Sequence, residues 1–514
     1  MKSRIIALLA ALVALGGALW AEVSFAPIFN PGAVLQCGLP VTIWGKADPG
    51  ETVEVFLDGK KAASATAGTD GRWCEAIPAQ APGGPHTLLV SSGTSTAVIE
   101  DIVFGEVWLA TGQSNMAMQL KGTRGGEERL AQAIPEIRFV QIPRKVGLPV
   151  EGEFTEQNIP WEKFIPGPNA KMSAVAFYFA EKLLPATGRA VGIIQCSVGG
   201  TPAQAWTPAW ALDERPELKY YADAVRAAMA SGTSQERWIK EVDALNVWSR
   251  DTINWRKTKQ GPPPKHPGTP NPGNPWNPQS PTVLFENMLA AVIPYTARGV
   301  IWYQGESNAM NPAEYRVLFP TMIGAWRKLW NAPEWPFLFV QLAAFGDVPS
   351  QDWPALRAAQ TFTRDTVPQT GMALAIDCGD KSDIHPKSKQ PVGERLALLA
   401  LDQVYGNKVI SRGPHLKSAS ISGNGVVLCF DFVADGLKAS DGAAMLPGFE
   451  LAGADGIFHP ASARLQEKDC VEISSDSVAE PKVIRYAWAN WVEPPVTLQN
   501  SAGLPAEPFQ EEVK

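Results

Sequence analysis

Between about residues 103 and 405, short apolar segments alternate with stretches of helical character, and this alternation constrains the fold most strongly. The apolar segments are EVWLATG, IRFVQI, VGIIQCSVGG, RGVIWYQGESN, FLFVQLA and MALAIDCGD. The helical stretches between or after them are SAVAFYFAEKLL and GERLALLALDQVYG. Strands that alternate with helices form a parallel sheet with helices on both faces. We therefore expect an α/β domain over residues 101–406.

Both flanks of this region have a different pattern. From about residue 23 to 96, short alternating segments such as VTIWGKA and ETVEVFLDG are separated by turn signals such as DPGE and TDGR. Turns at such close spacing are typical of an antiparallel β-sandwich. From about residue 408, segments such as GVVLCFDF and KVIRYAW return to this pattern. We expect an N-terminal β-sandwich domain at 22–100 and a C-terminal β domain at 407–514.

Residues 204–281 interrupt the alternation and are interpreted as an insertion. A helical stretch, ERWIKEVDALNVWSRDTINWRK, is followed by a segment in which nine of residues 262 to 281 are proline. Proline excludes regular helix and central strand, so this segment should run extended over the surface. It is either a passive strap or a rim of the ligand cleft, with Trp276 as a residue that stacks on a sugar ring.

The N-terminus has the pattern of a secretory signal peptide. Lys2 and Arg4 precede an apolar run from Ile5 to Trp20, and the small residue Ala21 is the expected cleavage point. Residues 1–21 therefore predict a secreted or periplasmic protein. No other stretch is apolar for long enough to span a membrane, so we expect no membrane span in the mature chain.

Charge and cysteine usage limit the partners. The formal charge of -7 becomes −9 after removal of Lys2 and Arg4, because residues 1–21 hold no acidic residue. Such a surface repels phosphate backbones, so nucleic acid is not expected to bind. The six cysteines are scattered singly, without the close pairs of zinc or redox motifs. Two disulfides within domains are possible, Cys37 with Cys74 and Cys429 with Cys470. The alternative is that these cysteines are ordinary buried free thiols.

Ser114 lies in the stretch TGQSNMAMQL, directly after an apolar segment that ends in glycine. The residues that follow permit a helix, which Ser114 or Asn115 would cap. Ser114 would then sit at a strand-to-helix turn, at the carboxyl edge of the sheet where ligands bind in α/β proteins. A serine here is either an ordinary cap or a nucleophile.

A serine nucleophile needs a base within hydrogen-bond reach. Among the five histidines, His385 alone falls in the ordered part of the α/β domain, after the segment MALAID. It therefore follows a strand at the same edge as Ser114. The other histidines lie in the β domains or the proline-rich segment: His86, His266, His415 and His459.

Two more strand ends carry polar turns. Gly199, Gly200 and Thr201 follow VGIIQCSV, and glycine lets a backbone amide approach a ligand closely. Glu306 and Asn308 follow VIWYQG, and Asn308 offers a side-chain amide. Each turn alone is common, but four polar turns at four strand ends of one sheet indicate a site.

These four blocks resemble a known family. GQSN around Ser114, GGTPAQAW from Gly199, WYQGESN from Trp302 and DIHP from Asp383 are similar to the signature blocks of the sialate O-acetylesterase family, within the SGNH hydrolase superfamily. The ADPGE turn and the ending IRYAWANW with NSAGLPAEPF extend the similarity over nearly the whole mature chain. The resemblance implies a flavodoxin-like three-layer α/β/α core with a parallel sheet, flanked by β-sandwich-like domains. It also implies removal of acetyl groups from sugars without metal or organic cofactor.

The resemblance assigns the main roles to Ser114 as nucleophile and His385 as general base and acid. The oxyanion hole would comprise the amides of Ser114 and Gly200 together with one side-chain amide. Because the third block is one residue longer than the superfamily pattern, that amide belongs to Asn308 or, second, to Gln304.

The acid that orients His385 is left open. The family position three residues before the histidine holds Ser382, so Asp383 is our choice, with Glu306 or a backbone carbonyl as rivals. Gln113 and Glu306 are further candidates for substrate contact.

Two alternative functions remain. An acetyl xylan esterase or another polysaccharide acetylesterase would use the same residues, whereas a sialate enzyme needs a cation for the substrate carboxylate, from Arg124, Lys171 or Arg357. A secreted carbohydrate-binding protein on a dead hydrolase core is the alternative of another class.

Overall fold

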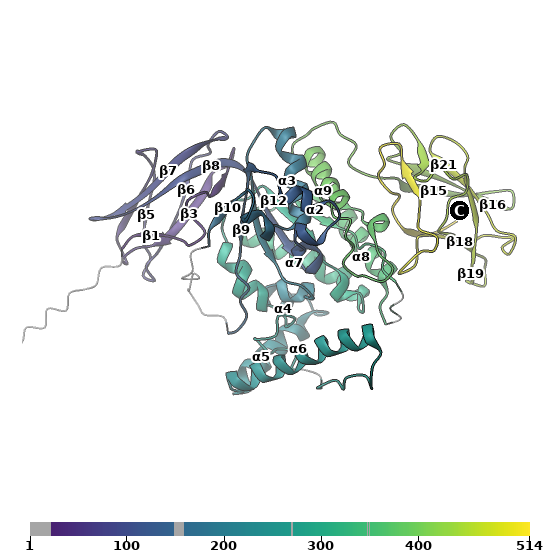
Figure 1. The fold of residues 1–514 in the computed structure, drawn as a ribbon, viewed down its shortest axis with the longest axis horizontal. Helices are drawn as coiled ribbons and strands as arrows, with labels where there is room; N and C mark the ends of the chain where they lie inside the picture. Colours follow the sequence, from purple (N-terminus) through teal and green to yellow (C-terminus); the bar gives the residue numbers. More distant parts are fainter. Residues whose placement is uncertain (1–21, 149–158, 269–270, 347, 349, 514) are drawn as a thin grey trace, which may run out of the picture.

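The computed structural model describes residues 22–148, 159–268, 271–346, 348 and 350–513. The predicted signal peptide lies outside the described residues. The chain forms a central α/β body between a β domain at the N-terminal end and another at the C-terminal end (Figure 1).

The central sheet has the strand order β10-β9-β11-β8-β12-β13-β14. Its strands are parallel except β10, which pairs antiparallel with β9 at one edge. The bounds are β8 Ser95–Gly112, β9 Ile134–Gln141, β10 Trp161–Phe164, β11 Val191–Ser197, β12 Gly299–Tyr303, β13 Phe337–Val340 and β14 Thr370–Ala373. Five predicted strand segments are thus confirmed, whereas MALAIDCGD overlaps β14 only at Met372 and Ala373. Strands β12 and β13 are buried at every residue, as expected for strands covered on both faces.

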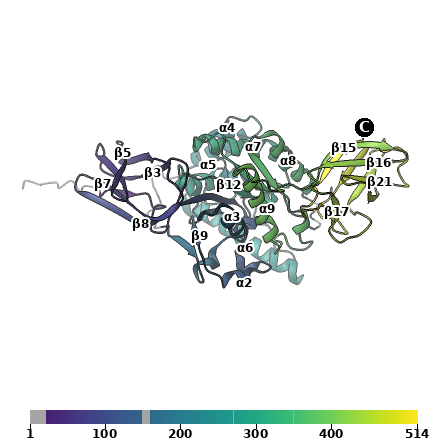
Figure 2. The same ribbon diagram turned by 90° about the horizontal axis from the view of Figure 1, so that it is seen from above.

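Helices cover both faces of this sheet. Figure 2 shows α3 and α9 on one side, and α7 and α8 on the other. Gly393 of α9 permits close packing, because a Cβ there would lie 2.6 Å from the Val175 carbonyl oxygen of α3. The bounds are α1 Ser114–Ala117, α2 Gly126–Leu130, α3 Ala174–Thr187, α7 Pro312–Leu329, α8 Trp353–Thr366 and α9 Gln390–Gln403, with short helical turns η1 Leu120–Gly122, η2 Pro168–Lys171, η6 Glu306–Asn308 and η7 Ile376–Cys378. Within the described ranges, no helix has the length and apolar character needed to cross a membrane.

The N-terminal β domain shares strand β8 with the central sheet. Residues 95–104 of β8 pair with β7, whereas residues 106–112 pair with β11. The predicted domain boundary at 100/101 therefore falls within one continuous strand. The remaining strands are β1 Ser24–Phe25, β2 Val34–Gln36, β3 Val41–Lys46, β4 Thr52–Leu57, β5 Lys60–Thr66, β6 Arg72–Ile77 and β7 Gly83–Ser92.

The C-terminal β domain has its own hydrophobic core and two four-stranded antiparallel sheets, β15-β16-β21-β20 and β19-β18-β22-β24. A disulfide joins Cys429 and Cys470 on neighbouring strands, as one of the two open pairings predicted. The other pairing is wrong, because Cys37 and Cys74 are free thiols. The bounds are β15 His415–Ser422, β16 Gly425–Asp431, β17 Leu437–Ala439, β18 Phe449–Ala452, β19 Phe458–Pro460, β20 Ser462–Leu465, β21 Cys470–Ser474, β22 Val483–Tyr486, β23 Leu498–Asn500 and β24 Phe509–Glu512.

The insertion contains η3 Ala203–Trp206, α4 Ala209–Asp213, α5 Lys219–Ala230 and α6 Gln235–Thr258, and it is followed by η4 Phe285–Leu289 and η5 Ala290–Val292. The prediction of an extended proline-rich segment is wrong for residues 271–280. Asn271, Asn274 and Asn277 each accept a hydrogen bond from the backbone amide two residues later, at 2.9 to 3.1 Å. The repeated Asn-Pro pair therefore makes successive turns, because asparagine side chains stabilise turns locally.

Candidate active site

The four predicted blocks meet at the carboxyl edge of the central sheet. They follow β8, β11, β12 and β14, which run parallel and therefore end at the same side. Gly112, the last residue of β8, has φ +132, and a Cβ there would lie 2.2 Å from the Tyr303 carbonyl oxygen. A glycine is therefore required for β8 and β12 to come together directly below Ser114.

Ser114 is the first residue of α1 and is half-buried. The predicted cap is shifted by one residue, because Gln113 occupies the N-cap position and makes no side-chain cap bond. The Gly199–Gly200 turn lies against the serine, since a Cβ on Gly199 would be 3.3 Å from the Ser114 Cβ. Gly200 is exposed with φ +73, a conformation that L side chains rarely adopt.

Asn308 is held with its side-chain amide in one orientation. Its Oδ1 accepts hydrogen bonds from the Ala203 amide at 2.9 Å and from Gln304 Nε2 at 2.7 Å. Its Nδ2 donates to Gln204 Oε1 at 3.0 Å. One Nδ2 proton donates to Gln204, which leaves the second for another acceptor.

Gln304 lies beneath Asn308 and is fully buried. Its Nε2 donates to Asn308 and, at 3.3 Å, to the Thr201 carbonyl, while its Oε1 accepts from the Tyr315 hydroxyl. With both amide protons in use, Gln304 orients Asn308 in this geometry. Gln113 has a similar supporting place, because its buried Oε1 accepts the Ser307 amide at 3.3 Å.

His385 lies in the loop between η7 and α9 and is partly exposed. Its Nδ1 is 3.6 Å from Asp383 Oδ1, and its backbone amide donates to the same oxygen at 2.9 Å. Burial lowers the pKa of His385, with a smaller contribution from the Lys389 charge, while Asp383 acts in the opposite direction. The ring is therefore favoured in the neutral form that accepts a proton.

Asn115 joins the Ser114 and His385 segments. Its Nδ2 donates to the Ile384 carbonyl at 3.0 Å and to Glu306 Oε1 at 2.5 Å, while its Oδ1 accepts from Lys389 Nζ. The neighbour of the predicted nucleophile thus bonds the neighbour of the predicted base. The sequence analysis did not predict these contacts of Asn115 and Lys389. The asparagine of the GQSN block was a signal for the first, whereas nothing in the segment SKQP indicates that its lysine is buried.

Glu306 is 4% exposed and accepts from Asn115, while its Oε2 has no hydrogen-bond partner among the described residues. Burial raises the pKa of this carboxyl group, and the Asn115 hydrogen bond and the Lys389 charge partly oppose the effect. A carboxylate in such an environment is typical of functional sites.

The three cations proposed for a substrate carboxylate have different surroundings. Arg357 is buried and donates to four backbone carbonyls, so its charge is committed to the fold. Lys171 pairs with Glu162 at 2.7 Å. Arg124 is exposed, and its backbone amide bonds the Lys387 carbonyl in the His385 loop at 2.9 Å. Arg124 is therefore the best placed of the three.

The described part of the proline-rich segment reaches this site through Gln279, whose Nε2 donates to the Gly200 carbonyl at 3.0 Å. Trp276, the predicted stacking residue, is half-buried against Gly147, where a Cβ would lie 3.8 Å from the indole. The segment therefore supports the glycine turn beside Ser114.

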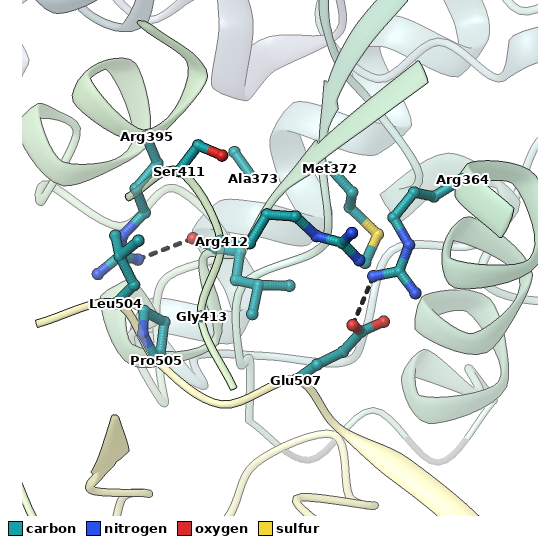
Figure 3. A pocket seen from close by; sticks show the side chains of 11 residues that line it. Arg364, Met372, Ala373, Arg395, Ser411, Arg412, Gly413, Leu504, Pro505 and Glu507 are labelled. Carbon is teal, nitrogen blue, oxygen red and sulfur yellow. Dashed lines mark hydrogen bonds and ion pairs between the residues drawn. The ribbon is translucent and has the colours of Figure 1, made fainter. Parts of the chain in front are cut away.

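A separate pocket lies where the α/β body meets the C-terminal domain (Figure 3). Arg364 pairs there with Glu507 at 2.5 Å, and Arg395 pairs with Asp377 at 2.7 Å. None of the four blocks lines this pocket, and its third arginine, Arg412, lies 4.1 Å from the centre of the Phe432 ring. Its lining residues are Arg364, Met372, Ala373, Leu374, Arg395, Ser411, Arg412, Gly413, Leu504, Pro505 and Glu507.

Potential metal ligands do not gather at the four blocks in the described part of the chain. In the C-terminal β domain, the side chains of Glu467, Asp469 and Cys470 lie close enough together to share an ion. The Cys470 sulfur is held in the disulfide, which removes it as a thiolate ligand.

Comparison with known proteins agrees with these blocks. The family model described as carbohydrate esterase, sialic acid-specific acetylesterase matches residues 104–248 and 268–402. Human sialate O-acetylesterase is 27% identical over 96% of this chain and 94% of its own length, and the rat enzyme is 26% identical over 91% and 90%. The crystal structure of a carbohydrate acetylesterase from Xanthomonas citri has a TM-score of 0.78 and 32% identity, covering 95% of this chain and 99% of that one. The chain thus belongs to the carbohydrate esterase family of sialic acid-specific acetylesterases, and with it to the carboxylic ester hydrolases.

Proposed function

We propose that this protein removes O-acetyl groups from sugars through an acetyl-enzyme formed on Ser114. The main support is Asn115, which donates to the Ile384 carbonyl and accepts from Lys389, because these two hydrogen bonds tie the Ser114 segment to the His385 segment. The relatives, which are named sialate O-acetylesterase and carbohydrate acetylesterase, support the substrate class.

The reaction proceeds in two halves. His385 takes the proton of the Ser114 hydroxyl as Oγ bonds the acetyl carbon, and the sugar oxygen leaves with that proton. Water then attacks the acetyl carbon, His385 takes its proton, and acetate leaves as the proton returns to Ser114. The amides of Ser114 and Gly200 and the free Nδ2 proton of Asn308 stabilise the oxyanion in both halves.

Asp383 is the acid that accompanies His385 in this proposal. The 3.6 Å distance between Asp383 Oδ1 and His385 Nδ1 is long for a hydrogen bond, so the carboxylate acts mainly through its charge. Glu306 bonds Asn115 and acts on the pair indirectly.

We further propose that the core is a flavodoxin-like SGNH fold. When β9 and β10 are set aside, the order β11-β8-β12-β13-β14 corresponds to 2-1-3-4-5, the order of flavodoxin-like sheets. Ser114 and Asn308 then follow the two strands at the switch point of that sheet.

The names of the mammalian relatives support acetylated sialate as the substrate. Arg124 would then bind the sialate carboxylate. Acetylated xylan and other polysaccharides remain the second candidate. The exported location rests on the sequence pattern of residues 1–21, and the Cys429–Cys470 disulfide supports it, because disulfides persist in oxidising compartments.

The deciding experiment measures acetate release from acetylated sialic acids, acetylated xylan and acetylated pectin, by the parent and by Ser114→Ala. We expect release by the parent, with the fastest turnover on acetylated sialic acid, and loss of release in the variant. A parent inactive on every substrate and on p-nitrophenyl acetate would favour the carbohydrate-binding alternative.

A further inference from the structure

Lys389 is a buried lysine that the proposed reaction does not use. It is 0% exposed and sits at the N-cap of α9. Its ammonium donates to Asn115 Oδ1 and lies 5.2 Å from the centre of the Tyr303 ring. A buried charge is costly unless it is compensated, so its place beside the site requires an explanation.

The Asn115 amide connects this lysine to Glu306. The ammonium donates to Oδ1, and Nδ2 donates to Glu306 Oε1 at 2.5 Å. The chemistry fixes the amide orientation, since Lys389 has only donors and an ionised Glu306 only acceptors. Among the contacts of the described residues, no direct ion pair joins the two charges, so the amide mediates between them.

This connection includes all three parts of the proposed machinery. Asn115 follows the nucleophile Ser114, and its second Nδ2 proton bonds the Ile384 carbonyl, next to His385. Glu306 begins the η6 turn that carries Asn308. A change in the Lys389–Asn115–Glu306 connection would therefore displace nucleophile, base and oxyanion donor together.

We propose that Lys389, Asn115 and Glu306 form a buried positioning unit that holds the Ser114 segment against the His385 segment. The inference rests on the proposed function, because it assigns these residues to the Ser114–His385 reaction. Lys389 acts through Asn115 and through its charge, without contact with the substrate.

The charges around the unit fit this role. The titratable groups whose charges act on Lys389 are Glu306 from η6, Cys378 from η7 and Asp383 from the His385 loop. Burial lowers the pKa of Lys389 to about 8, and these three groups oppose the shift. Below that pH the ammonium is charged, and its charge lowers the pKa of His385. Protonation of the base is thus suppressed where the lysine is charged.

The test compares Lys389→Met with Lys387→Met, which removes an exposed lysine from the same loop. Steady-state hydrolysis of p-nitrophenyl acetate is measured across pH. For Lys389→Met we expect kcat to fall by about tenfold to a hundredfold with little change in KM, because the reacting groups are misplaced. The acid limb of kcat/KM should also move to higher pH, since loss of the ammonium raises the pKa of His385. Lys387→Met should keep the parent kcat and acid limb.

A second variant covers the case in which Lys389→Met does not fold. Lys389→Met combined with Glu306→Gln removes both buried charges, which proteins tolerate better than removal of one. The same upward movement of the acid limb is expected. A parent-like kcat and an unshifted acid limb, in whichever variant folds by circular dichroism, would overturn the inference.

Ser114→Ala and His385→Ala separate this inference from the proposed function. Full activity in either of them would refute the proposed reaction itself. Loss of activity in both, with parent-like kinetics in the Lys389 variants, would refute the positioning unit alone.

Discussion

Glu106 and Glu306 are two buried carboxylates with opposite surroundings. Glu106 lies in β8, where the N-terminal β domain joins the central sheet, and its side chain is 0% exposed. Its two oxygens accept from donors on several segments, and two of these donors are arginines: Gln36, Cys37, Arg189, Arg298 and Tyr405. These hydrogen bonds and charges outweigh burial, and the pKa of Glu106 is lowered.

Glu306 lies at the edge of the proposed active site, and among the described residues its side-chain donor is Asn115, while backbone amides of its own turn also stabilise the charge. Burial therefore dominates, and its pKa is raised. A buried glutamate thus stabilises the fold where its charge is fully paired, as at Glu106. At the proposed active site, Glu306 has fewer partners for its charge. Buried polar groups with incomplete hydrogen bonding and shifted pKa values concentrate at functional sites.

The largest effect is expected for Glu106→Gln, which should cost stability and spare catalysis. The variant leaves two partly exposed arginines without their charge partner, so the loss is at most the roughly 3–5 kcal/mol that removal of one partner from a buried ion pair costs. Urea unfolding measures the loss, while kcat of the folded protein should stay at the parent value. A variant as stable as the parent would show that Glu106 is not a stabilising centre.

The same variant has a defined pH dependence. Because the folded pKa of Glu106 is lowered, its contribution to stability is present above the ordinary value of 4.5 and is lost as the pH falls through the folded pKa. The parent should therefore lose stability below pH 4.5 more steeply than Glu106→Gln. Parallel curves would contradict the lowered pKa.

The next effect belongs to Asn308→Ala at the active edge. An oxyanion donor contributes roughly 3 to 4 kcal/mol to the barrier, so kcat should fall by a factor of hundreds. The thermal unfolding midpoint, measured alongside, should fall while the protein still folds, because the Ala203 amide and Gln304 Nε2 lose their acceptor. Full turnover would remove Asn308 from the oxyanion hole.

The sequence predicts which strands end at the site more reliably than it predicts the side-chain contacts between the turns that follow them. Apolar segments such as FLFVQLA mark strands by their own composition, and parallel strands place the following turns together. Asn115 instead bonds partners 191, 269 and 274 positions away, and no local pattern encodes such pairs. The continuous strand β8 was divided at residue 100 because a change of pattern resembles a domain boundary even where the backbone pairing continues.

Glu306→Gln should have an intermediate effect, and it should reduce activity more than stability, the reverse of Glu106→Gln. Glutamine still accepts from Asn115, and Lys389 is able to lose its proton, so less stability should be lost than in Glu106→Gln. Displacement of the η6 turn should reduce kcat by up to about a hundredfold. Both quantities are measured as for Glu106→Gln. A larger loss of stability than of activity would place Glu306 with Glu106 among the structural carboxylates.

The smallest effect is expected for Asp383→Asn, which removes an exposed charge near His385. Exposed ion pairs contribute under about 1 kcal/mol, so kcat/KM should change by less than roughly fivefold. Because Asp383 raises the pKa of His385, the acid limb should move to lower pH. A loss of about ten-thousandfold, as for a buried triad aspartate, would contradict a base that depends only weakly on this carboxylate.

Labelling with a fluorophosphonate, a reagent that reacts with activated serines, tests the central claim most directly. Peptide mass spectrometry should find the label on Ser114 in the parent, and Ser114→Ala and His385→Ala should remain unlabelled. Label on another serine, or undiminished label on Ser114 in His385→Ala, would contradict a hydroxyl activated by that imidazole.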